Sequence, residues 1–160
     1  MSPVIPVLLA FGLALIGWLA ARARAQVFRR EAGRALHSLP GFHGWFVALA
    51  VLLPALLFAA IWSSLTPGLA ESEALKSPVA AQLPAFGFQR DAIIAEARTL
   101  AASPGAAAFN PLASQLAVPL RASLNFYGTI GIIATLLIGF AAGAIAFLRL
   151  RPDFTARTQV

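Results

Sequence analysis

The chain has 160 residues, of which 59% are hydrophobic and only 11% are charged. A soluble domain carries about 25% charged residues, so this composition is typical of a membrane protein. The sequence contains no cysteine, which excludes disulfides and thiolate-ligated metal sites. The net charge of +6 does not predict a nucleic-acid partner, because the basic residues lie beside apolar segments and not in a folded basic module.

Three segments without a charged side chain, at residues 4–21, 44–62 and 126–148, predict three transmembrane helices. A helix rises about 1.5 Å per residue, so about 20 residues cross a hydrocarbon core of about 30 Å. We expect an all-α integral membrane protein in the lipid bilayer, with a small helical extracytoplasmic segment between the second and third spans. Buried helices of a soluble protein are the alternative, but these segments are apolar on every face. The first segment alone could be a cleaved signal peptide, although its arginines follow the apolar run instead of preceding it.

The distribution of arginine predicts the orientation. The loop 22–43 carries five arginines against one acid, and the tail 149–160 carries three against one. In the segment 63–125, four basic residues are balanced by four acids. Because short arginine-rich loops stay in the cytoplasm, we expect a periplasmic N-terminus and 63–125 segment, and a cytoplasmic loop and C-terminus. The arginines nearest the spans, on which this orientation depends, are Arg22, Arg24, Arg29, Arg30, Arg34, Arg149 and Arg151.

Aromatic residues lie near the ends of the predicted spans, at Trp18, Trp45, Trp62 and Tyr127. Trp45 and Trp62 are separated by about 26 Å of helix. Indole and phenol rings favour the membrane–water interfaces, so we expect these four residues to mark them. The alternative is that they only fill lipid-facing surface.

The stretch HSLPGFHGWFVAL, residues 37–49, places two histidines ahead of the second apolar segment. His37 and His43 are six positions apart, whereas two metal ligands on one helix face are three or four apart. Pro40 and Gly41 break any helix that comes from the arginine-rich loop. We therefore predict a turn where the chain re-enters the membrane; a metal site and a histidine contact to a partner subunit are the alternatives.

Small residues in the third segment predict close helix packing. Gly139 and Gly143 form a Gly-x-x-x-Gly pattern, Gly128 precedes them, and such glycines let another helix approach closely. The approaching helix belongs either to the first two spans or to a companion subunit. Pro54 predicts a kink in the second span. No span carries an ionisable residue, so we expect no cofactor, no metal, no catalytic residue and no ion pathway.

The segment 63–125 is long for a bare loop, and its pattern predicts helices. One apolar face runs through residues 88–102, and Ser103-Pro104-Gly105 ends that helix. A weaker helix is expected at 69–76. Asn110 followed by Pro111 predicts a further helix start, and Pro119 would interrupt that helix or open the third span.

The basic residues of this segment allow two interpretations. Arg90, Arg98 and Arg121 could capture phosphate, or they could belong to solvated helix faces. The four acids alongside leave no net positive field, which favours solvated faces.

The stretch ALHSLPGFHGWFVALAVLLPALLFAAIW, residues 35–62, resembles the N-terminal extension of the permease subunit of bacterial phosphate ABC (ATP-binding cassette) transporters of the Pst type. Members show a similar Leu-x-Ser-x-Pro-Gly-Tyr-His-Gly run, in which Phe42 here replaces the tyrosine. The end FLRLRPDFTARTQV, residues 147–160, is similar to the juncture between this extension and the permease core. The resemblance implies a multi-pass protein of the bacterial inner membrane. It also implies permease subunits, an ATPase subunit and a periplasmic phosphate-binding protein as partners.

The family's permeases continue with more transmembrane helices and a cytoplasmic coupling loop that carries a Glu-Ala-Ala motif, which these 160 residues lack. We therefore expect the tail 149–160 to lead to a permease core. The chain would then be an accessory region that anchors and braces the permease and is not an enzyme. The alternative is a free-standing membrane scaffold or regulator that binds a partner complex through the third helix.

The predicted orientation can be tested with single cysteines, because the chain has none of its own. Cysteines in the segment 63–125 should react with a membrane-impermeant maleimide from the periplasm, whereas cysteines in the loop 22–43 should not. Labelling of the 63–125 segment only after the inner membrane is breached would contradict the orientation.

Overall fold

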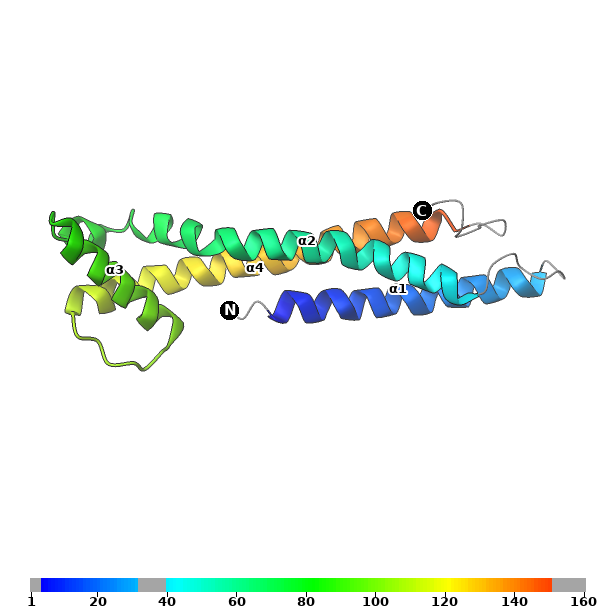
Figure 1. Ribbon diagram of the computed structural model, residues 1–160, viewed down its shortest axis with the longest axis horizontal. Coiled ribbons are helices and arrows are strands. Elements are labelled where there is room, and N and C mark those ends of the chain that lie inside the picture. Colours follow the sequence, from blue (N-terminus) through cyan, green and yellow to red (C-terminus); the bar gives the residue numbers. More distant parts are fainter. Residues whose placement is uncertain (1–3, 32–39, 151–160) are drawn as a thin grey trace. The chain divides into compact units, whose positions relative to one another are not determined.

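The computed structural model of the chain describes residues 4–31 and 40–150. Within them it is helical, with no strand. The elements are α1 (Val4–Glu31), α2 (Pro40–Ala74), the short 3₁₀ helix η1 (Pro78–Gln82), α3 (Gly87–Ala102) and α4 (Pro111–Leu148) (Figure 1). Three of these helices are long and apolar enough to cross a membrane, over Val4–Val27, Gly41–Ala74 and Pro111–Leu148. The expected all-α membrane protein with a helical segment between the second and third spans is confirmed.

The second and third long helices exceed the uncharged segments from which they were predicted. α2 has 35 residues and α4 has 38. At about 1.5 Å per residue these helices are about 52 and 57 Å long, well above a hydrocarbon core of about 30 Å. Each long helix therefore has a part that lipid tails cannot cover.

Two local predictions are wrong for the same reason. Residues 69–76 do not form a helix of their own, because α2 continues to Ala74. Pro119 neither interrupts the helix that starts at Pro111 nor opens a new one, because it lies inside the continuous α4. A proline removes only one backbone donor, and the flanking turns keep their hydrogen bonds and their packed side chains. α2 likewise runs through Pro54 without a break.

The chain divides into two compact units. We call Ser2–Ile61 with Gly131–Val160 the apolar unit, and Trp62–Ile130 the middle unit. α1 belongs to the apolar unit and α3 to the middle unit, while α2 and α4 contribute one part to each.

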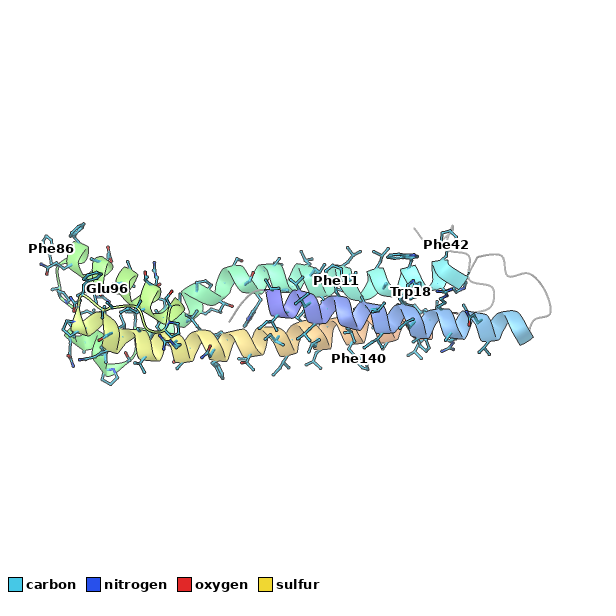
Figure 2. The ribbon with its side chains drawn as sticks, turned by 90° about the horizontal axis from the view of Figure 1, so that it is seen from below. Phe11, Trp18, Phe42, Phe86, Glu96 and Phe140 are labelled. Atoms are coloured by element: carbon cyan, nitrogen blue, oxygen red, sulfur yellow. The ribbon has the colours of Figure 1, made fainter. Side chains whose placement is uncertain are left out.

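In the apolar unit, the buried side chains of α1 are small, and many large apolar side chains face outward. α1 lies beside the first part of α2 and the last part of α4 (Figure 1). Figure 2 shows Phe140 on the outside of this unit. This arrangement is typical of helices that pack in lipid, where a leucine gains nothing by leaving the apolar solvent. The buried residues of α1 are Ala10, Ala14, Ala21 and Ala25, and strongly exposed leucines of the unit are Leu8, Leu53, Leu57, Leu137 and Leu148.

The middle unit has an ordinary hydrophobic core. α3 packs against the end of α2 and the start of α4 (Figure 1). The apolar face predicted for residues 88–102 is the buried face, formed by Ile93, Ile94, Ala97 and Leu100. α3 ends at Ala102, as predicted, and Gly105 follows in a left-handed turn with φ +98°.

Polar contacts close this core at its edges. Arg98 of α3 forms an ion pair with Glu71 of α2, in which the Nε–Oε2 distance is 2.8 Å. Glu96 Oε1 accepts hydrogen bonds from the backbone N–H groups of Phe109 (2.6 Å) and Asn110 (3.1 Å). Asn110 Oδ1 in turn accepts one from Leu112 N at 2.9 Å, which is the predicted helix cap. These hydrogen bonds fix the end of the α3–α4 loop that leads into α4.

Arg121 of α4 satisfies the C-terminal end of α3. Its Nη2 donates to Leu100 O at 2.6 Å and its Nε donates to Ala101 O at 3.3 Å. Helix ends leave carbonyls without an intrahelical partner, and a cation there also matches the helix dipole. One side chain therefore links two helices of the middle unit.

Replacing this link should loosen the middle unit alone. Arg121→Met should lower its free energy of unfolding by about 1 kcal/mol, because two α3 carbonyls lose a charged donor. The measurement is limited proteolysis of the 103–110 loop in the purified full chain. Arg90→Met removes the same charge from an exposed position of α3 and should leave cleavage unchanged. Equal cleavage of both variants would contradict the role given to Arg121.

Candidate functional site

In the apolar unit, α4 approaches α2 closely at Gly143. A Cβ atom added there would stand 2.5 Å from Val51 Cγ2 of α2, a distance that real side chains do not adopt. At Gly139, one turn earlier on α4, an added Cβ would lie 3.2 Å from Leu13 of α1 and 3.4 Å from Val51 and Ala55 of α2. Both glycines of the predicted pattern thus face other helices of the same chain.

α1 approaches α2 through two further glycines. A Cβ on Gly17 would meet Val47 Cγ1 at 3.1 Å, and one on Gly44 would meet the Trp18 indole at 2.6 Å. The predicted packing glycines do not include Gly17 or Gly44. The repeat Ala10, Ala14, Gly17, Ala21 in α1, which keeps one helix face small, was the available indication of this contact.

Among the side chains that the structure describes in this unit, Thr135 and His43 are polar and fully buried. Thr135 Oγ1 donates to the carbonyl of Gly131 at 2.7 Å, so its hydroxyl is satisfied within its own helix. His43 lies in the first turns of α2, where the chain was predicted to re-enter the membrane. His37 lies outside the described residues.

Two arginines of α1 contact aromatic rings. The Arg22 guanidinium lies 5.1 Å from the centre of the Trp18 ring, and that of Arg24 lies 4.8 Å from the centre of the Phe147 ring on α4. Such cation–π contacts retain the charge at the end of an apolar helix. Of the other predicted orientation residues, Arg149 is exposed, Arg29 and Arg30 lie in the last turn of α1, and Arg34 and Arg151 lie outside the described residues.

The structure brings two of the predicted interface aromatics together. Trp62 Nε1 of α2 donates to the backbone carbonyl of Tyr127 on α4 at 2.9 Å. The partly buried Gly128 follows directly. Trp45 is 60% exposed on α2, whereas Trp18 is packed against Gly44. Trp62 and Tyr127 are therefore neighbours in the middle unit. Trp18 instead packs between α1 and α2.

Three basic residues of the middle unit have structural partners. Arg98 pairs with Glu71, and Arg121 donates to the end of α3. Lys76 Nζ lies 2.7 Å from Glu73 Oε2, and this hydrogen bond, together with the attraction of the carboxylate, raises the pKa of the Lys76 ammonium above 10.5. Two of the three arginines considered for phosphate capture are thus committed to holding helices together, which favours the alternative without an anion site.

Nothing in the described ranges 4–31 and 40–150 assembles a metal centre, since no three histidine or acidic side chains gather there. The described residues form close helix contacts and cation–π contacts in the apolar unit, and a tryptophan–carbonyl hydrogen bond in the middle unit.

Comparison with known families agrees with the presence of three apolar helices that are long enough to cross a membrane. A family model described as "Phosphate ATP-binding cassette transporter" matches residues 5–160. The chain belongs to this phosphate ATP-binding cassette transporter family. A search of curated proteins and a search of solved structures each give no match.

Membership in the phosphate transporter family confirms the resemblance found in residues 35–62 and 147–160. The match also covers the middle unit, where the sequence offered few distinctive residues. In this family member, the three apolar helices and the family together indicate a multi-pass membrane protein.

The Gly143 contact allows a direct test of helix packing in this member of the phosphate transporter family. Gly143→Ala should lower the melting temperature in detergent, because the new methyl overlaps Val51, at a cost of about 2 kcal/mol. Val51→Ala should relieve the clash, so the double variant should lose less stability than the sum of the single variants.

Gly12→Ala serves as the matched control, because a Cβ on Gly12 meets no atom within 4 Å. Its melting temperature should stay the same or rise slightly. Strict additivity of the Gly143 and Val51 substitutions would show that the two residues do not touch.

Proposed function

We propose that the chain is the accessory membrane region of a phosphate ABC transporter permease in the bacterial inner membrane, where it anchors and braces the permease. The observation that carries this proposal is the family match over residues 5–160. Phosphate would pass through a permease core to which the tail 149–160 leads, and ATP would be hydrolysed by an ATPase subunit. The chain itself would supply no catalytic group.

The contacts of the apolar unit support a bracing role. Its three helices are held by fixed close contacts, such as the one between Gly143 and Val51. A packed core of this kind is rigid, since moving a helix means losing van der Waals contacts that lipid does not replace. Such a unit suits an anchor better than a gate.

The middle unit supports a role at the outer surface. It contains all four acids of the segment 63–125, and its ion pairs are exposed, as water-facing contacts are. We propose that this unit is periplasmic and that the phosphate-binding protein docks on it. Three large apolar side chains are available for such docking, since exposed apolar patches mark interaction surfaces. They are Phe86 (68% exposed), Phe88 (80%) and Phe109 (94%), of which Figure 2 labels Phe86.

Measurements of phosphate uptake can distinguish a bracing role of the chain from a role in phosphate binding. In cells that depend on this transporter, Gly143→Leu should lower the maximal uptake rate of radiolabelled phosphate several-fold, because fewer transporters assemble. The KM for phosphate should stay unchanged, because the substituted residue lies outside the phosphate path. Ala141→Leu, which introduces the same side chain at an exposed position of the same helix, should leave both quantities unchanged.

Two outcomes would overturn the proposal. A raised KM with a normal maximal rate would place the chain in the phosphate path. Normal uptake by Gly143→Leu, together with failure of the tagged chain to co-purify with the ATPase subunit, would favour the free-standing scaffold.

A further inference from the structure

An open pocket lies on the middle unit, between α3 and the start of α4. Its volume is about 450 Å³, and its lining is part apolar and part polar. The structure describes every residue of Trp62–Ile130, so the surroundings of this pocket within the unit are known. Among the lining residues, Phe88, Gln89, Ala92 and Glu96 belong to α3, and Asn110 and Leu112 belong to the start of α4.

Glu96 is the one charged residue that lines the pocket (Figure 2). Its Oε1 accepts hydrogen bonds from the backbone N–H groups of Phe109 and Asn110, which fix the carboxylate in place. Its Oε2 has no hydrogen-bond partner within the described middle unit, and it is not buried. The second oxygen is therefore available to a cation, and little further side-chain freedom is lost when the cation binds.

No cation of the middle unit neutralises this carboxylate. At 100° per residue, Arg90 and Arg98 lie about 120° and 160° around α3 from Glu96. Arg98 is paired with an acid of α2, and Arg121 donates to the carbonyls at the end of α3. Lys76 is paired with the acid three residues before it. The pocket thus has a negative charge that its own unit leaves uncompensated.

Two exposed phenyl rings accompany the pocket. Phe88 lines it and is 80% exposed, and Phe109, whose N–H is bonded to Glu96, is 94% exposed. A small inorganic cation could bind the carboxylate but would leave both rings in water. A protein segment covers the rings and the carboxylate together, and aromatic side chains beside a pocket are typical of the residues that dominate protein interfaces.

We propose that this pocket docks a protein segment in which a lysine or arginine lies next to an apolar side chain. The cation would pair with Glu96 Oε2, and the apolar side chain would pack on Phe88, Ala92 and Leu112. The inference rests on the proposed docking of the phosphate-binding protein on the middle unit. It adds the position of the contact and the chemistry that the partner's surface must carry.

The test measures binding of the purified phosphate-binding protein of the same transporter to the full chain in nanodiscs, with empty nanodiscs as background. Glu96→Gln removes the charge but keeps an oxygen for the two backbone N–H groups. It should raise the Kd about tenfold, the effect of losing one hydrogen bond to a charged group. Since salt screens a partly exposed ion pair, this difference should shrink at high ionic strength.

A second variant acts on the shape of the pocket. Ala92→Leu fills the pocket from an exposed position of α3 and should also raise the Kd. Cleavage of the 103–110 loop by protease should stay unchanged in both variants, which shows that the middle unit is intact.

Matched controls come from the same helix. Asp91→Asn removes an exposed carboxylate outside the pocket, and Ala95→Leu adds the same side chain as Ala92→Leu at an exposed position outside the pocket. Neither control should change the Kd.

Several results would overturn the proposal. Unchanged Kd values for Glu96→Gln and Ala92→Leu would exclude the pocket and leave docking elsewhere on the middle unit. Equal weakening by Asp91→Asn would reduce the effect to the overall charge of the unit. A two-copy particle that Ala92→Leu converts to one copy would assign the pocket to a second copy of the chain.

Failure of the proposed docking has a different signature. If the phosphate-binding protein does not bind the unsubstituted chain, the docking on the middle unit and this inference are both wrong. The bracing role is judged separately, by phosphate uptake in the Gly143→Leu variant.

Discussion

Everything in the apolar unit depends on how closely α4 approaches α2 at Gly143. Inside lipid, backbone hydrogen bonds are satisfied within each helix, and apolar side chains gain nothing by leaving the tails. The helices are therefore held together by van der Waals contacts between complementary surfaces. With no side chain on Gly143, Val51 reaches the α4 backbone, and dispersion contacts accumulate on both sides of it. The same approach leaves an apolar groove between α1 and α4, above Val51.

The two units share two helices, but different interactions stabilise them. In the apolar unit the buried side chains of α1 are alanines, and Thr135 satisfies its hydroxyl on its own helix. In the middle unit five isoleucines and leucines pack among six alanines, and an ion pair links α3 to α2. Burying leucine side chains stabilises a fold only where the unburied side chains would face water. This difference favours lipid around one unit and water around the other.

The sequence predicted the elements that rest on strong local patterns. The spans followed from the absence of charge, and α3 followed from its apolar face and from the stop at Ser103-Pro104-Gly105. The extensions of α2 and α4 could not be predicted in this way. Pro67-Gly68 and Pro119 are local helix breakers, and the helix continues through them because tertiary packing of Ala70 and Leu120 outweighs the lost donor. Contacts such as Trp18 with Gly44 join residues 26 positions apart, and no local pattern encodes that pairing.

The candidate site shows why charge in a sequence does not by itself identify a ligand. Arg90, Arg98 and Arg121 look equivalent in sequence, yet Arg98 is paired with a carboxylate and Arg121 with helix-end carbonyls. An anion that competed for either residue would have to replace a contact that links two helices. It would thereby destabilise the middle unit on which it bound. An anion is therefore disfavoured at the charged contacts of α3. Arg22 and Arg24 of α1 lie against aromatic rings, in contacts that stabilise a cation.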